Sequence, residues 1–160
     1  MKSLRLITLS AVFATVSAGI AGAQTATQTV TFQVNAINQV AVTGAPSLTI
    51  NTAVAGSAPT PATATVTWAV TTNQSTAKIT ASIPTAMPTG LTLSANLTAP
   101  SGATSSGLTA LTTTAADMVT GITKVNAGSL DLVYQLDATT AAGVVASGTR
   151  VVTYTITGGS

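Results

Sequence analysis

Apolar and polar residues alternate along residues 28–42, QTVTFQVNAINQVAV. An alternation of period two predicts a β-strand with one buried face. The strand would be long, because strands of about 5–6 residues are the most common. Asn38 interrupts the apolar row, so either the chain bends near Ile37 and Asn38 or the strand continues beyond its own domain. The apolar positions of this predicted strand are Val30, Phe32, Val34, Ala36, Val40 and Val42.

Similar alternating stretches recur along the chain and predict further strands. Residues 63–70 and 77–83 are separated by the turn TTNQST, so we expect a β-hairpin with Trp68 as its core anchor. Residues 112–122 favour either a helical turn or a short strand. The remaining strands are expected at 48–50, 91–97, 130–136 and 152–156, with loops at 51–62 and 101–110.

Between seven and nine strands, with turn signals at short spacing and no convincing amphipathic helix, indicate an all-β protein. We expect an antiparallel two-sheet β-sandwich, immunoglobulin-like or jelly-roll-like. The domain would span residues 24–160 and include the long N-terminal strand 28–42.

The first 23 residues are typical of a signal peptide. Lys2 and Arg5 precede the uncharged apolar stretch 6–20, and Ala21-Gly22-Ala23 provides a small-residue cleavage site. The apolar stretch is shorter than the ~20 residues that cross a bilayer. We therefore expect cleavage before Gln24, no membrane insertion afterwards, and a secreted or cell-surface protein.

Charge is sparse once the signal peptide is removed. The net charge of the full chain is +2, with five Lys and Arg and three Asp. Loss of Lys2 and Arg5 leaves three cations against three aspartates, a neutral chain without the basic surface that nucleic acid or anionic lipid requires. High β-propensity with so little charge is typical of chains that associate edge to edge.

Side chains for catalysis or cofactor binding are scarce. The chain has no histidine, cysteine or glutamate, so no disulfide forms and the usual general bases and soft metal ligands are missing. Asp131 and Asp137 would lie about 20 Å apart along one strand, too far for a shared acid–base site. We expect no enzyme and no cofactor, with the aspartates either solvated or forming a weak calcium site with loop carbonyls.

The aromatic residues after the signal peptide are Phe32, Trp68, Tyr134 and Tyr154. Each falls in the apolar row of its predicted strand, which favours the core. A platform for stacking sugars would need at least one ring to face outward.

The two ends of the chain resemble secreted bacterial fibre and coat subunits, the pilin-like and spore-coat-U-like proteins. The resemblance rests on the alternating residues Val30, Phe32, Val34 and Ala36, on the last strand GTRVVTYTIT, and on the Thr- and Ala-rich composition without cysteine. It implies an incomplete immunoglobulin-like sandwich, assembly by insertion of one subunit's N-terminal strand into a neighbour's groove, and a periplasmic chaperone as a partner. Many pilins carry a disulfide that this chain lacks, and Gly158-Gly159-Ser160 extends past the last strand.

Together with this resemblance, the patterns predict a structural subunit of an extracellular fibre, coat or surface layer. The resemblance implies that it forms a homopolymer by β-strand addition, for which the candidate residues are Val30, Phe32, Val34, Ala36, Val40 and Val42. The strand could equally belong to its own sandwich, since ordering it costs ~1–2 kcal/mol per residue and needs both a groove and a ladder partner. The alternative function is a monomeric cell-surface binding module, for carbohydrate or another ligand, acting through loops 51–62 and 101–110.

Overall fold

The computed structural model describes residues 22–159, which divide into two units. The expected signal peptide, residues 1–23, lies almost wholly outside these residues and stays a prediction. The first unit ends at Gln33, and its described residues 22–33 contain no helix or strand and are exposed. The second unit begins at Val34 and contains the strands.

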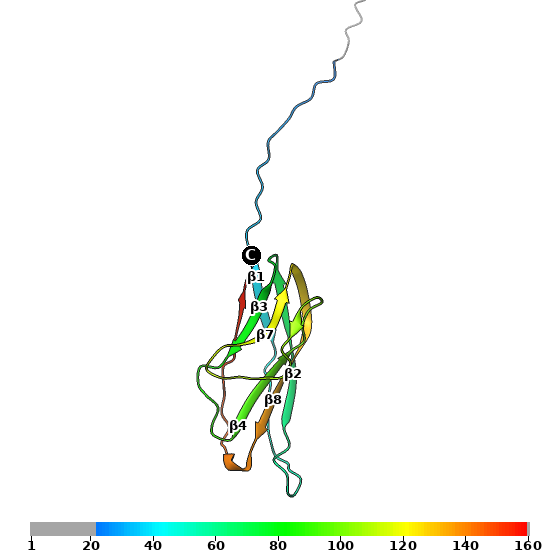
Figure 1. Ribbon diagram of the computed structural model, residues 1–160. Helices are drawn as coiled ribbons and strands as arrows, with labels where there is room; N and C mark the ends of the chain where they lie inside the picture. Colours follow the sequence, from blue (N-terminus) through cyan, green and yellow to red (C-terminus); the bar gives the residue numbers. More distant parts are fainter. Residues whose placement is uncertain (1–21, 160) are drawn as a thin grey trace, which may run out of the picture. The chain divides into compact units, whose positions relative to one another are not determined.

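Two antiparallel sheets form the second unit (Figure 1). One has five strands in the order β1-β2-β8-β4-β6, and the other has four in the order β5-β7-β3-β9. The predicted two-sheet β-sandwich is therefore confirmed. Within the described residues the elements are β1 (Asn38–Thr43), β2 (Ala62–Thr72), β3 (Ala77–Ser82), β4 (Leu91–Leu97), β5 (Thr104–Ser105), β6 (Thr109–Ala110), β7 (Ala116–Ile122), β8 (Val125–Ala138), the 3₁₀-helix η1 (Thr140–Ala142) and β9 (Thr153–Thr157).

The strands of the two sheets differ in length. β2 has 11 residues and β8 has 14, whereas β3 has 6 and β9 has 5. At about 3.3 Å per residue, β2 runs for about 36 Å and β3 for about 20 Å. In Figure 1, β4 and the lower parts of β2 and β8 accordingly extend beyond β3 and β7. Loops, rather than strands, face that end of the five-stranded sheet.

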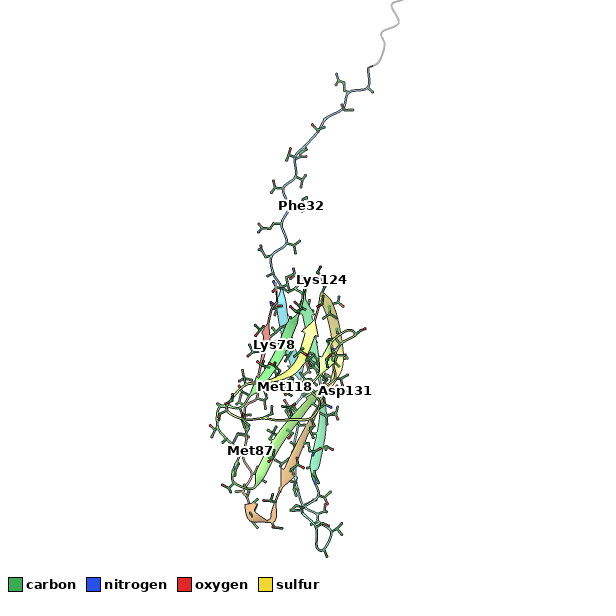
Figure 2. The ribbon with its side chains drawn as sticks, in the orientation of Figure 1. Phe32, Lys78, Met87, Met118, Lys124 and Asp131 are labelled. Carbon is green, nitrogen blue, oxygen red and sulfur yellow. The ribbon has the colours of Figure 1, made fainter. Side chains whose placement is uncertain are left out.

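Apolar side chains from both sheets form the core. Trp68 on β2 is 1% exposed, which confirms it as a core anchor. The same core contains Leu132 of β8 and Leu97 of β4 from its own sheet, and Ile79 of β3 and Met118 of β7 from the other (Figure 2 labels Met118). Because the chain has no disulfide, this packing and the ladder hydrogen bonds hold the sandwich together.

The expected hairpin between residues 63 and 83 is wrong. Both strands exist, as β2 and β3, but β2 pairs with β1 and β8 while β3 pairs with β7 and β9. Their apolar rows, represented by Val70 and Ile79, face one another across the core from opposite sheets. Alternation shows which face of a strand is buried, but it does not identify the neighbouring strand.

Two shorter predictions also change, and one that was left open is decided. Residues 48–50 form no strand, although Leu48 packs against the core. Of the two alternatives for residues 112–122, a helical turn or a short strand, the structure has the strand, β7. The expected loop 101–110 includes the two-residue strands β5 and β6, which pair with β7 and β4.

Truncation of one core side chain tests this packing. The Leu132 side chain is fully buried, so its truncation leaves a cavity in the core. Leu132→Ala should lower the free energy of unfolding by ~2–5 kcal/mol. Denaturant unfolding followed by the fluorescence of Trp68, the only tryptophan, measures it. The neighbouring exposed Asp131, replaced by alanine, is the control and should change stability by less than about 0.5 kcal/mol. Equal effects of the two substitutions would contradict the assignment of Leu132 to the core.

Candidate assembly site

The strand expected over residues 28–42 is divided in the structure. Only its last part belongs to a strand, because β1 begins at Asn38. β1 pairs with β2, and Val40 lies opposite Val70 and Val42 opposite Trp68. Residues 28–37 belong to no strand. The division falls at the polar residue that interrupts the apolar row.

The six residues predicted for assembly therefore lie in two different environments. Val40 is half-buried against the core, and Val42 is 39% exposed beside a cavity. Val30, Phe32 and Val34 are 73%, 89% and 78% exposed, and Ala36 is also exposed. Figure 2 labels Phe32 on this segment. Alternate exposed apolar side chains on one stretch are typical of a surface that another element covers.

The backbone just before β1 is held by the turn after β2. Asn73 donates from Nδ2 to the carbonyl of Asn35 (2.8 Å), and its Oδ1 accepts from the amide of Ile37 (2.8 Å). The amide of Asn73 donates to the carbonyl of Ile37 (3.3 Å). The Thr72 hydroxyl donates to Oδ1 of Asn38 (2.7 Å). Residues 35–37 thus continue the direction of β1 past the end of β2.

A groove opens where loops face the long end of the five-stranded sheet. It consists of two adjoining cavities of about 330 and 650 Å³, which share Leu48, Met87, Leu136, Gly148 and Arg150 as lining residues. The smaller cavity is also lined by Val42, Leu93, Val152 and the tyrosines Tyr134 and Tyr154. We call this surface the intersheet groove. Its floor includes Leu93 of β4 and Leu136 of β8, because the inner rows of these strands continue here beyond β3 and β7.

Two chain segments line the groove without belonging to any strand. One follows β1, at residues 44–50, and the other precedes β9, at residues 148–152. Across the described part of the chain, no backbone–backbone hydrogen bond involves residues 45–50 or 148–151. Apart from the Thr149 carbonyl, which accepts from Nη1 of Arg150, and Pro46, which has no amide hydrogen, their amides and carbonyls are free to pair with an added strand.

Tyr134 and Tyr154 form the polar part of the smaller cavity. Their hydroxyls lie 2.9 Å apart and join β8 to β9 across the two sheets. Burial raises the pKa of Tyr134 above its ordinary value. Burial also raises the pKa of Tyr154, and its hydrogen bond to Tyr134 raises it further. The pair stays neutral over a wide pH range.

Arg150 is the charged residue that lines the groove. Its guanidinium donates to the carbonyl of Ala86 through Nη2 (3.0 Å) and Nε (3.3 Å), and to the carbonyl of Thr149 through Nη1 (2.8 Å). These bonds tie the segment before β9 to the loop that carries Met87.

The other charges do not gather: Lys124 lies in the bend between β7 and β8, and the rest lie on strands. Asp117 pairs with Lys78 at 2.9 Å, with both side chains about half exposed. Asp137 accepts from the amide of Gln135, and Asp131 is exposed. Within residues 22–159, no three His, Cys, Asp or Glu side chains lie close enough to share a metal ion. In the same range, no helix has the length and apolar character to cross a membrane.

The aromatic residues are divided between core and surface. Trp68 and Tyr134 are buried and Tyr154 is half-buried, as their positions in the strands predicted. Phe32 is the exception: the alternation of the sequence also placed it in the core, but it is exposed in the single chain. The groove itself was missed by sequence reasoning. The sequence signal that could have indicated it is Leu48 and Ile50. These apolar residues lie in a segment too short to cover the inner face of β8.

Comparisons of the chain with protein-family models, with curated proteins and with solved structures return no match. The exposed apolar row and the intersheet groove are the features of the chain that point to a function.

Because of the tyrosine pair, the free energy of unfolding should depend on pH in the alkaline range. Both pKa values are higher in the folded chain than the value of about 10 for an unfolded tyrosine. The stabilisation is therefore complete below pH ~10 and decreases as pH rises above it, since the unfolded tyrosines ionise first. The double variant Tyr134→Phe, Tyr154→Phe should lose less stability between neutral and alkaline pH. Tyrosinate absorbance in the native protein provides a direct check, and two tyrosines titrating near pH 10 would contradict the geometry.

Proposed function

We propose that this protein is a structural subunit that self-associates by β-strand addition, with residues 28–34 as the added strand and the intersheet groove as its acceptor. The observation that carries the proposal is the 89% exposure of Phe32 in an apolar row, in a chain that also has an unfilled apolar groove. The assembly would be an extracellular fibre, coat or surface layer, as the resemblance to secreted bacterial subunits implies.

The chemistry of the segment matches that of the groove. In an extended strand, alternate side chains lie on one face about 6.6 Å apart, so Val30, Phe32 and Val34 would all face the floor. Burial of each would contribute ~1.5–3 kcal/mol. The backbone of the added strand would find partners in residues 45–50 and 148–151, apart from the Thr149 carbonyl, which accepts from Arg150. Both the apolar contacts and the ladder that such a strand needs are therefore available.

Electrostatics do not oppose this association. Residues 24–37 contain no charged side chain, and the groove contains only Arg150, whose guanidinium is hydrogen-bonded to backbone carbonyls. No ion pair has to be desolvated when the segment enters. The contact should therefore depend weakly on salt.

The binding-module alternative finds less support. Trp68, the ring best suited to stack on a sugar, is 1% exposed. Residues 51–53 and Pro59 from the first expected binding loop line the larger cavity, whereas the second loop, 101–110, lines neither cavity. We therefore do not propose this function.

The substitution Phe32→Asp tests the proposal on the mature chain. A charge in the groove should abolish assembly, while the unfolding free energy of the monomer should change by less than about 0.5 kcal/mol, because the side chain is exposed. Size-exclusion chromatography with light scattering and negative-stain microscopy measure assembly.

Thr31→Asp is the matched control, because it adds the same charge one residue earlier on the opposite face of the strand. It should assemble as the unmodified chain does. If Phe32→Asp forms the same filaments or large oligomers as the unmodified chain, the apolar row is not the assembly surface.

A further inference from the structure

We propose that the larger cavity of the intersheet groove, of about 650 Å³, binds a carboxylate of the fatty-acid class. Its carboxylate would lie on Arg150 and its hydrocarbon chain along the apolar lining. The site lies within a single copy, so it goes beyond self-association and does not depend on it. Three features support it: fixed walls, a lining with one cation and no carboxylate, and two unused N–H groups on Arg150.

The walls of the larger cavity come from segments far apart in the sequence, and backbone hydrogen bonds hold them. The amide of Thr60 donates to the carbonyl of Thr52 (2.8 Å) and closes the loop between them. The amide of Thr139 donates to the carbonyl of Gly90 (2.8 Å) and joins the chain after β8 to the start of β4. Gly90 has a φ of +80°, and a Cβ there would lie 2.6 Å from the amide nitrogen of Ala142 in η1. The wall is therefore closely packed.

The lining of the larger cavity is mostly apolar and contains no carboxylate. Asp137, the acidic residue nearest to Arg150 in the sequence, lies between Leu136 and Ala138, which both line the cavity. Its side chain therefore lies on the opposite face of β8. The volume falls within the range of roughly 300–1,000 Å³ that is usual for small-molecule sites. The larger apolar side chains of the lining include Leu48, Ile50, Met87, Leu91, Leu136 and Val145.

Arg150 is a half-buried cation without an acidic partner in the part of the chain that the structure describes. A guanidinium has five N–H groups. Nε and Nη2 donate to the carbonyl of Ala86, and Nη1 donates to that of Thr149. One N–H therefore remains on Nη1 and one on Nη2. Two parallel bonds from a guanidinium are the geometry in which arginine recognises a carboxylate, and the carbonyl contacts already hold this guanidinium in place.

A single cation beside apolar surface favours a ligand with a single carboxylate and a hydrocarbon chain. Each methylene group buried in the cavity would raise the affinity up to about fourfold, from ~0.8 kcal/mol per methylene. An inorganic anion would leave the apolar lining in water. A sugar would place its hydroxyl groups against that lining, where no exposed aromatic ring is present to stack on it.

The ligand and an added strand would compete for part of the groove, because the two cavities share Met87, Leu136 and Arg150. Binding is therefore measured on the mature Phe32→Asp chain. In this variant the groove is free whether or not the unmodified chain assembles by strand addition.

Calorimetric titration with decanoate, below the concentration at which it forms micelles, tests the site. Decanoate should bind one to one and about tenfold more tightly than decanol, because the alcohol lacks the charge-assisted bonds to Arg150. Octanoate should bind about tenfold more weakly than decanoate, because its chain is shorter by two methylene groups. A chain that binds no decanoate, or that binds decanol or octanoate equally tightly, would overturn the proposal.

Methyl NMR locates the bound ligand. Decanoate should shift the methyl signals of Ile50, which lines only the larger cavity, and of Met87. Ile79 and Met118 are the matched controls, because they are fully buried in the core, and their signals should not move (Figure 2 labels both methionines). Shifts at the core residues without a shift at Ile50 would contradict the assignment.

Arg150→Gln tests the contact with the carboxylate. Its affinity for decanoate should fall about tenfold, to that for decanol, while decanol binds as before. Lys124→Gln is the control, because it removes the same charge from an exposed bend outside both cavities, and it should change neither affinity. Unchanged binding of decanoate by Arg150→Gln would show that the carboxylate does not lie on Arg150. If the variant binds neither ligand because its wall opens, the titrations and the Ile50 shift in the parent chain decide.

The ligand site and the proposed function fail separately. If decanoate does not bind, the ligand site is wrong and strand addition stands. If the unmodified chain never assembles, strand addition is wrong, and the binding of decanoate to one copy still decides the ligand site.

Discussion

The unequal length of the two sheets is the constraint on which the rest of the structure depends. An apolar sheet face has to be covered by another layer. β2 and β8 carry their apolar inner rows for 11 and 14 residues, but β3 and β9 face them for only 6 and 5. The covered half forms the core around Trp68. The other half is closed by loops and leaves the groove with Leu93, Tyr134 and Leu136.

The edges of the sandwich show the same incompleteness. β1 and β9 are each an edge strand, with β6 and β5 at the opposite edges of their sheets, and β1 and β9 lie beside each other. Beyond Thr43 and before Thr153, the chain continues as segments that belong to no strand. Unpaired backbone beside apolar surface is the arrangement that proteins usually block with charges or prolines. Here a single proline, Pro46, and one cation, Arg150, line the smaller cavity. Arg150 holds the segment before β9 against the loop of Met87 rather than repelling a neighbour.

The sequence predicts the strands well and their arrangement less well. Alternation located β2, β3, β4, β8 and β9 and identified the buried faces, because side-chain period is a local property of the chain. It could not show that β2 and β3 lie in opposite sheets. Two strands with buried apolar rows can either pair side by side in one sheet or face each other across the core. The alternation of apolar residues could not predict the groove either. It results from the difference between the lengths of strands far apart in sequence, and no single residue marks it.

Asn38 explains why one alternating stretch has two environments. Its side chain accepts from Thr72, and Asn73 fixes the next residues outward, so polar bonds define where β1 begins. Residues 28–37 belong to no strand of the sheet. Because the burial of an apolar side chain and the ordering of its residue are comparable in free energy, apolar contacts alone do not order this stretch. Val30, Phe32 and Val34 therefore keep their apolar surface exposed in the single chain, and the partner proposed to order them would have to bring both a groove and a backbone to pair with.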